Sequence, residues 1–320
     1  MKLNSKLINI LNENNCRCTI ILGSGFHIQA LGEDSILGSW PKLLKNQDNS
    51  IQLTNCYPLD FEQLVMRSAN NEGRKSNTEK SAQENENLIS AEICFELKSA
   101  QDNALEFSKH KYPIGFLNPD YVSDVISLNF DTTSLELCAE IANFEIDYSQ
   151  FKKYSSSKLD DIEIPFYEVI FPTRKSIRFW FPHGSTIKNN PITLGTRSYA
   201  TKLNFLERLR KHSKQKEGVE KNTIDMEVDT SWYHQMTHSP VLILGAEMSS
   251  DEWDMWFAIV NRERNFSKNS NKEFKYPIFQ MRECESKNKI QTTWFEPLCI
   301  GLNYNDQWLE IEKQFNKSRN

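Results

Sequence analysis

The chain has 320 residues, with 38 Lys and Arg against 43 Asp and Glu, so its formal net charge is −5. This length can hold one large domain or two modest ones, and the interspersed charges argue against direct nucleic-acid binding. There is no run of about 18 apolar residues and no signal-peptide core, so we expect a cytoplasmic protein without a membrane span. The seven cysteines are scattered without a C-x-x-C pair, which disfavours a zinc ribbon and a disulfide framework.

The first predicted elements are a helix over 3–15 and a buried strand over 18–22. A strand, glycines and a helix start form the arrangement with which many α/β proteins hold a phosphate, because glycine lets the backbone approach the anion. Ile28 occupies the third glycine position of the dinucleotide fingerprint, so the match is partial and a tight strand-to-helix turn remains the alternative. The residues in question are Gly23, Ser24, Gly25 and Phe26, followed by His27, which suits a loop or helix cap better than a metal site.

Residues 40–112 read as a helical insertion that could form a lid or the second wall of a cleft. Helices are expected from Trp40, over 57–69 and over 88–110, while the polar stretch 70–87 is expected to be a surface loop. The predicted domain organisation is therefore a Rossmann-like domain made of 1–39 and 113–320, interrupted by this insertion.

A short apolar run over 125–128 predicts a buried strand, and it ends in Asn129 and Asp131. Residues two apart in an extended chain point the same way, so these two side chains should project together from the carboxyl end of the strand. Open α/β sheets bind ligands at that end. The alternative is that they cap the next helix, over 132–143.

The second half contains further strands and helices. Residues 144–165 are expected to be irregular, and two strands over 166–171 and 177–181 follow, the second leading into His183, Gly184 and Ser185. Beyond a helix over 193–212 and a polar linker over 213–229, the clearest strand of the chain spans 240–245 and ends at Gly245. A helix over 252–261 should turn Trp253, Trp256, Phe257 and Val260 toward the core; strands over 276–280 and 290–295 and a helix over 301–315 complete the prediction.

These elements indicate an α/β fold with a Rossmann-like parallel sheet flanked by helices, which places all four polar strand ends at one edge. The order of the four motifs resembles the sirtuin (SIR2-like) superfamily, specifically its bacterial anti-phage defence members that hydrolyse NAD. The matching residues are Gly23, Ser24, Gly25 and Phe26, then Asn129 and Asp131, then His183, Gly184 and Ser185, then Gly245.

The resemblance implies hydrolysis of the nicotinamide–ribose bond, with NAD as substrate and no metal. It implies that Asn129 orients water or ribose, that His183 acts as general base or binds a ribose hydroxyl, and that Asp131 holds the nicotinamide carboxamide. The glycines, Ser24, Phe26 and Ser185 would then bind the rest of NAD.

The chain departs from the protein-deacylase sirtuins at two points. It has no cysteine between Cys138 and Cys284, where deacylases carry two C-x-x-C pairs, and Leu128 stands where they carry Gln. Both differences favour water as the acceptor. A deacylase and a non-catalytic NAD- or ADP-ribose-binding regulatory subunit remain the alternatives, whereas the missing third glycine disfavours a dehydrogenase. Because NAD loss is toxic, we expect control by homo-oligomerisation or by a partner, such as the hexameric helicase-like (HerA-type) ATPase of related systems.

Overall fold

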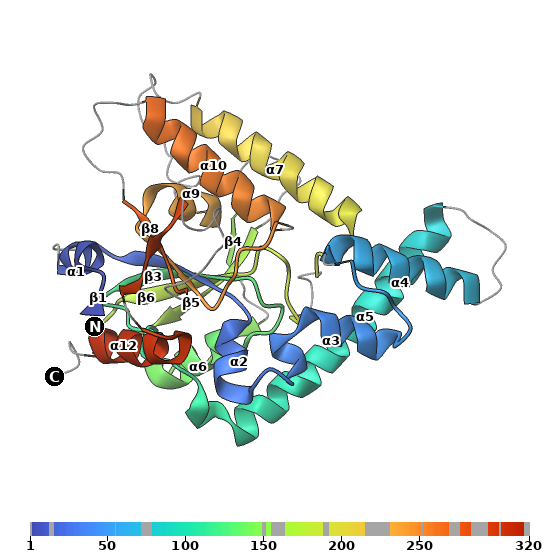
Figure 1. Ribbon diagram of the computed structural model, residues 1–320, viewed down its shortest axis with the longest axis horizontal. Helices are drawn as coiled ribbons and strands as arrows, with labels where there is room; N and C mark the ends of the chain where they lie inside the picture. Colours follow the sequence, from blue (N-terminus) through green and yellow to red (C-terminus); the bar gives the residue numbers. More distant parts are fainter. Residues whose placement is uncertain are drawn as a thin grey trace.

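The computed structural model has an eight-stranded, mostly parallel β-sheet at its centre (Figure 1). The structure describes residues 2–12, 16–54, 56–71, 79–148, 152–154, 164–187, 192–214, 231–250, 252–268, 276–282, 294–300 and 302–316. In sheet order the strands are Lys152–Tyr154 (β4), Ile164–Ile170 (β5), Ser176–Trp180 (β6), Val122–Ser127 (β3), Cys18–Leu22 (β2), Val241–Leu244 (β7), Ile278–Gln280 (β8) and Glu296–Pro297 (β9).

Six of these strands are parallel, in the order β6-β3-β2-β7-β8-β9. The chain leaves β2 toward β3 and β6, and then crosses to the other side of β2 for β7, β8 and β9. This is the strand order of a Rossmann fold, whose switch point between β2 and β7 is where such sheets bind ligands. β5 is antiparallel to both β6 and β4, so these two strands extend the sheet at the β6 edge. The predicted α/β fold is therefore confirmed.

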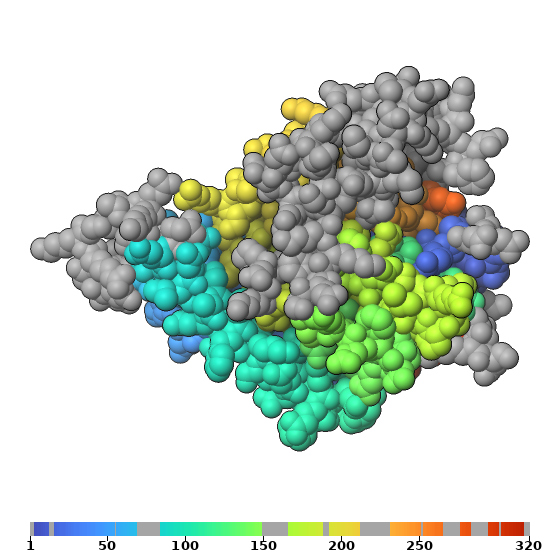
Figure 2. Space-filling view, turned by 180° about the vertical axis from the view of Figure 1, so that it is seen from behind, coloured from blue at the N-terminus to red at the C-terminus, as the bar shows by residue number. Residues whose placement is uncertain are grey.

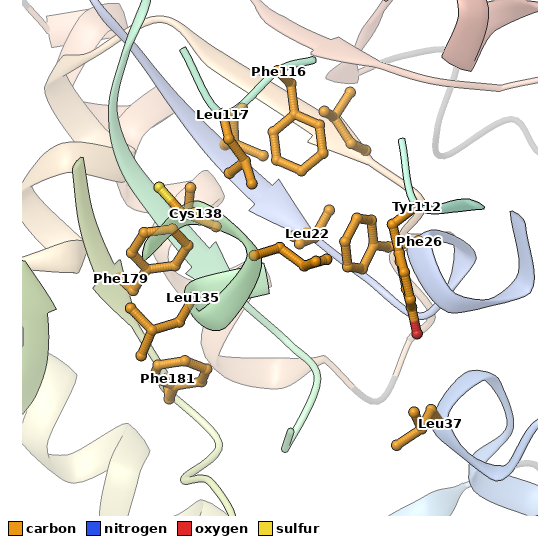
Figure 3. Close-up of a cluster of buried hydrophobic side chains, with 14 of the residues drawn as sticks. Leu22, Phe26, Leu37, Tyr112, Phe116, Leu117, Leu135, Cys138, Phe179 and Phe181 are labelled. Carbon is orange, nitrogen blue, oxygen red and sulfur yellow. The ribbon is translucent and has the colours of Figure 1, made fainter. Parts of the chain in front are cut away.

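The central strands bury side chains on both faces of the sheet, as their uninterrupted apolar runs predict. Ile20 and Leu22 of β2 pack into one core with Leu244 of β7, whereas Ile21 packs into a second core with Ile243. Figure 3 shows part of the first core, where side chains of the sheet meet those of the helices beside it.

Helices cover both faces of the sheet (Figure 1). On the side of the first core lie Gly25–Leu31 (α2), Thr133–Ala142 (α6) and Tyr304–Asn316 (α12); on the side of the second lie Thr196–Lys214 (α7), Trp232–His238 (α9) and Trp253–Lys268 (α10). No helix in the described part of the chain has a stretch long and apolar enough to cross a lipid bilayer.

The segment between α2 and β3 is helical. It consists of Ile36–Gly38 (η1), Trp40–Gln47 (α3), Tyr57–Asn71 (α4), Glu79–Phe107 (α5) and Lys109–Lys111 (η2). Seen from either side, α4 and the first part of α5 form one end of the molecule, with α7 alongside (Figures 1 and 2). Phe61 of α4 and Ile93 of α5 belong to the first core. The division of the chain into a Rossmann-like domain and an insertion subdomain stays a prediction.

Two predictions for the first hundred residues are wrong in their bounds. The first helix, Ser5–Asn12 (α1), begins later than predicted because Lys2–Leu3 (β1) pairs in a separate two-stranded sheet with Cys299–Ile300 (β10), and residues 13–15 lie outside the described residues. The polar stretch 70–87 is not wholly a loop, because α5 already begins at Glu79. Its Glu, Lys, Ala and Gln residues favour a helix whatever their hydropathy, and hydropathy alone misplaced this boundary.

Later in the chain, two edge strands differ from the prediction. Residues 152–154, expected to be irregular, form β4 because β5 offers a free edge for pairing. Of the strand expected over 290–295, residues 290–293 lie outside the described residues, and the next strand, β9, begins only at Glu296.

Candidate functional site

A pocket of about 380 Å³ lies at the switch point, beyond the carboxyl ends of β2, β3, β6 and β7. Its volume is within the range of about 300–1,000 Å³ that is typical of small-molecule sites. Helices η1, α3, α4 and α5 supply much of the remaining lining. The strand ends contribute Gly23 and Ser24 after β2, Asn129 and Asp131 after β3, His183 after β6, and Ala246, Glu247, Met248 and Ser249 after β7.

Three glycines bring the loops after β2 and β7 into direct contact. The N–H of Gly23 donates to the carbonyl of Leu244 at 3.0 Å, and that of Gly25 to the carbonyl of Gly245 at 2.8 Å. A Cβ added to Gly23 would lie 2.6 Å from the Cβ of Ala246, and Gly245 has a φ of +66°, which favours glycine. Close packing of two crossover connections therefore accounts for these glycines by itself, in agreement with the tight-turn alternative.

The first turn of α2 has little donor capacity left for an anion. The N–H of Gly25 is bound to Gly245, and the N–H of Phe26 reaches the carbonyl of Gly23 at 3.2 Å. The ring of Phe26 is buried in the first core, with its centroid 4.8 Å from that of Tyr112 (Figure 3). Ser24, by contrast, is exposed, lines the pocket and makes no side-chain capping bond. Ser24 is thus the residue of this loop whose side chain is best placed for a ligand.

Asn129 and Asp131 lie together at the pocket, each held by a second strand end or helix. The Nδ2 of Asn129 donates to the carbonyl of Gly23 at 3.2 Å, which ties the loop after β3 to the loop after β2. The Oδ1 of Asp131 accepts from the N–H of Thr133 at 2.9 Å, and its Oδ2 lies 2.9 Å from the Nε2 of His27. Asp131 therefore caps α6, as the alternative proposed, and also lines the pocket.

His27 is fully buried, and its other ring nitrogen, Nδ1, lies 3.1 Å from the hydroxyl of Tyr112. Burial alone would raise the pKa of Asp131, but the charge of His27 and the hydrogen bonds from His27 and Thr133 outweigh it and hold this pKa below its ordinary value. His27 is thus not in a loop or cap: it is the counter-charge of the Asp131 carboxylate.

A second buried histidine–carboxylate pair lies across β6 and α10. The Nε2 of His183 is 3.2 and 3.1 Å from the two carboxylate oxygens of Asp254, and 3.5 Å from an oxygen of Glu252. Asp254 is fully buried, whereas His183 and Glu252 line the pocket. Burial would lower the pKa of His183, but the two carboxylates more than offset this and raise it. Burial would likewise raise the pKa of Asp254, but His183, Lys202 and a backbone hydrogen bond hold it below its ordinary value.

Lys202 of α7 completes this charged cluster. Its Nζ is buried and has no hydrogen-bond partner within the described ranges. Burial lowers the pKa of Lys202 to about 7, although the charges of Asp254 and Glu252 oppose this shift. At neutral pH the amine is therefore divided between its charged and uncharged forms.

His183, Glu252 and Asp254 also place ligand atoms within 4.8 Å of one another, as a metal site would. The charge balance argues against that assignment. The positive charges that His183 and Lys202 carry when protonated offset the two carboxylates, and a bound cation would lie beside the buried amine of Lys202. We therefore assign this cluster to ion pairing.

The structure brings some of the predicted site residues together and not others. Gly23, Ser24, Asn129, Asp131 and His183 line the pocket. The other predicted ligand-binding residues are not in its lining. Gly25 and Phe26 pack beneath the loop after β2, and Gly245 contacts Gly25. Gly184 adopts a φ of +81°, and the hydroxyl of Ser185 accepts from the N–H of Ile187 at 3.3 Å.

Sequence reasoning missed Asp254, Glu252 and Lys202. The helix after β7 buries Asp254, Met255, Ala258 and Ile259, whereas the predicted core residues Trp253, Trp256, Phe257 and Val260 are only half-buried. The helical spacing was right, but the buried residues Met255, Ala258, Ile259 and Arg262 lie two positions beyond the predicted ones, because bulky aromatic residues outweighed smaller ones in the prediction. An acidic residue within an apolar stripe was the signal that could have identified Asp254.

Neither a comparison with models of known protein families nor a search of curated proteins finds a match to this chain. By its fold and its site, the chain is an α/β protein with Rossmann-type strand order and a ligand-sized pocket at the switch point of the sheet. Two buried histidine–carboxylate pairs, each with one member in the lining, distinguish this pocket chemically.

Proposed function

We propose that this chain hydrolyses NAD at the nicotinamide–ribose bond and releases nicotinamide and ADP-ribose. One observation carries the proposal: Asn129, Asp131 and His183, from the ends of two different strands, line a single pocket at the switch point. The sirtuin-like resemblance selects the same three residues from their order in the sequence alone.

The chemistry requires an oriented water and a held leaving group. The oxygen of water bonds to C1′ of the ribose as the C1′–N bond breaks, and the bonding electron pair goes to nicotinamide, which leaves neutral. No strong general acid is therefore needed. The proton of the water passes to a ring nitrogen of His183 and then to solvent. Asn129 orients the water or a ribose hydroxyl through Oδ1, since Nδ2 is bound to Gly23. Asp131 accepts from the carboxamide N–H, and Ser24 contacts the diphosphate.

A second candidate is a non-catalytic subunit that binds NAD or ADP-ribose. Two observations favour it: both carboxylate oxygens of Asp131 already have partners, and the N–H of Gly25 is bound to Gly245. Carboxylate oxygens accept more than one hydrogen bond, so the first observation does not exclude a contact with nicotinamide.

We also propose a role in anti-phage defence, in which the loss of NAD stops the infected cell. Such an activity has to be inactive until infection, so we place its control in homo-oligomerisation or in a partner chain such as a hexameric helicase-like ATPase. This part of the proposal rests on the resemblance.

The test is nicotinamide release and NAD consumption by the purified chain, compared with His183→Ala and Asn129→Ala, with NAD binding measured by calorimetry. We expect each variant to lose about 10²–10⁴-fold in turnover while binding NAD within a few-fold of the wild type. A wild-type chain that binds NAD tightly and leaves it intact, alone and with candidate partners, would establish the binding subunit instead.

A further inference from the structure

The cluster beyond the pocket wall has a role that the hydrolysis scheme leaves open. His183 lines the pocket, but its Nε2 is turned to Asp254, which is fully buried and not part of the lining. No hydrogen bond to Nδ1 of His183 is present among the described residues. The two nitrogens of this ring therefore have different surroundings, one facing a carboxylate and the other without a hydrogen-bond partner in the described part of the chain.

We propose that Asp254 is the positioning residue for His183, holding the ring through Nε2 so that Nδ1 takes the proton of the attacking water, with Lys202 as the counter-charge that limits protonation of the ring. This inference rests on the proposed hydrolysis. It assigns roles to two residues that the resemblance did not select.

The geometry supports the assignment through tautomer choice. A carboxylate accepts a hydrogen bond and cannot donate one, so Asp254 requires the proton of neutral His183 to be on Nε2. The lone pair is then on Nδ1. The N–H of Met255 donates to Oδ1 of Asp254 at 2.9 Å, and the N–H of Thr193 donates to the carbonyl of His183 at 2.7 Å. Asp254 is therefore held by the backbone of its own helix, and His183 by the backbone of the segment before α7.

The charges around His183 come from α7 and from the start of α10. Asp254 of α10 and Glu252, the residue before this helix, favour the imidazolium, and Lys202 of α7 opposes it. The ring of Tyr199 in α7 packs against the His183 ring, with centroids 5.7 Å apart. The ring of Phe130, in the loop after β3, also lies near the His183 ring, and its side chain is uncharged. A base that is held too strongly in its protonated form cannot accept a proton, and Lys202 offsets part of the rise in the pKa of His183 that the carboxylates cause.

Two substitutions should shift the titration of His183 in opposite directions. Asp254→Asn keeps the shape of the side chain and a hydrogen-bond acceptor but removes the negative charge, so the pKa of His183 should fall by about one unit or more. Lys202→Met keeps most of the volume and removes the positive charge, so this pKa should rise. If Asp254 and Lys202 only filled space, neither substitution would change the pKa of His183.

The measurement is a pH titration of the histidine ring signals by NMR on the full chain, which has six histidines. The His183 signal is assigned by its loss in His183→Ala. In the wild type and both variants, nicotinamide release from NAD is followed over the same pH range. Glu252→Gln is the control for a second carboxylate, just before α10, whose oxygen lies 3.5 Å from Nε2.

We expect the acid limb of kcat/KM to follow the NMR titration, moving to lower pH in Asp254→Asn and to higher pH in Lys202→Met. We also expect kcat to fall by about 10²-fold or more in Asp254→Asn, with partial recovery in Asp254→Glu. Unchanged ring titration and unchanged kcat in Asp254→Asn would overturn the proposal.

If Asp254→Asn does not fold, Lys202→Met keeps the test decisive, because we do not expect the removal of this buried charge to prevent folding. An unchanged titration of His183 in Lys202→Met would overturn the role of Lys202. If the titrations move as expected but the wild type releases no nicotinamide, the pairing of Asp254 with His183 is supported and NAD hydrolysis is what fails.

Discussion

The two buried histidine–carboxylate pairs at the pocket are arranged in opposite senses. In the first, the carboxylate of Asp131 lines the pocket and His27 lies behind it; in the second, the ring of His183 lines the pocket and Asp254 lies behind it. Both pairs are almost completely buried. The first pair therefore presents a carboxylate to the pocket and the second a titratable ring, each with its partner beneath.

The surroundings of the two pairs differ more than the pairs themselves. The Nε2 of His27 lies 2.9 Å from an oxygen of Asp131, and its Nδ1 lies 3.1 Å from the hydroxyl of Tyr112. His183 has one engaged nitrogen, a second carboxylate in Glu252, and the amine of Lys202 nearby. The ring of the first pair thus has a protein group beside each nitrogen, whereas the ring of the second has one nitrogen without a partner among the described residues. We infer that the first holds the site in shape and the second performs proton transfer.

The largest expected difference between the two histidine–carboxylate pairs is in their contribution to the free energy of unfolding. His27→Ala leaves the buried carboxylate of Asp131 without a counter-charge, which should lower the free energy of unfolding by about 3–5 kcal/mol. His183→Ala leaves Asp254 beside Lys202, so we expect a smaller loss, roughly 1–3 kcal/mol. Denaturant unfolding of both variants at pH 7 measures this. Equal losses would mean that Lys202 does not compensate and that the two pairs are energetically alike.

The pH dependence of stability comes next in size, at about 1.4 kcal/mol for each unit of pKa shift. The pKa of Asp131 in the folded chain lies below its unfolded value, so its contribution is present near neutrality and is lost as the pH falls through the folded value. The pKa of His183 is raised on folding, so its contribution is complete below its unfolded value and is lost as the pH rises through the raised one.

The difference in unfolding free energy between the wild type and His183→Gln should therefore shrink from mildly acidic to mildly alkaline pH. The same difference for Asp131→Asn should shrink toward acid instead. Denaturant unfolding across this range distinguishes the two pairs, and a parallel pH dependence in both variants would remove the distinction between them.

The smallest expected effect is that of Tyr112→Phe. This substitution removes the hydroxyl that lies 3.1 Å from Nδ1 of His27 and leaves a buried nitrogen without its partner, at a cost of about 1 kcal/mol. Because Tyr112 does not line the pocket, we expect NAD turnover per folded molecule to stay at the wild-type level. A tenfold loss of turnover would show that the first pair takes part in the chemistry and does not only hold the site in shape.

The sequence by itself was sufficient for the fold class, and it selected three side chains that line the candidate pocket. Continuous apolar runs such as 18–22 and 240–245 need burial on both faces, which requires a parallel sheet covered by helices. The glycines and polar residues that end these runs must then meet at one edge. Asn129, Asp131 and His183 were found in this way because the signal is local: each follows a strand directly.

Only the tertiary structure decided which buried side chains pair with Asp131 and His183. His27 meets Asp131 across 104 positions and Asp254 meets His183 across 71, distances along the chain that no local pattern encodes. The face that α10 turns inward was decided by packing on the sheet, and this buried Asp254 in place of Trp253. Strand ends follow from local hydrophobicity, whereas the protonation of the side chains they carry depends on charges that other segments bring into a low-dielectric interior.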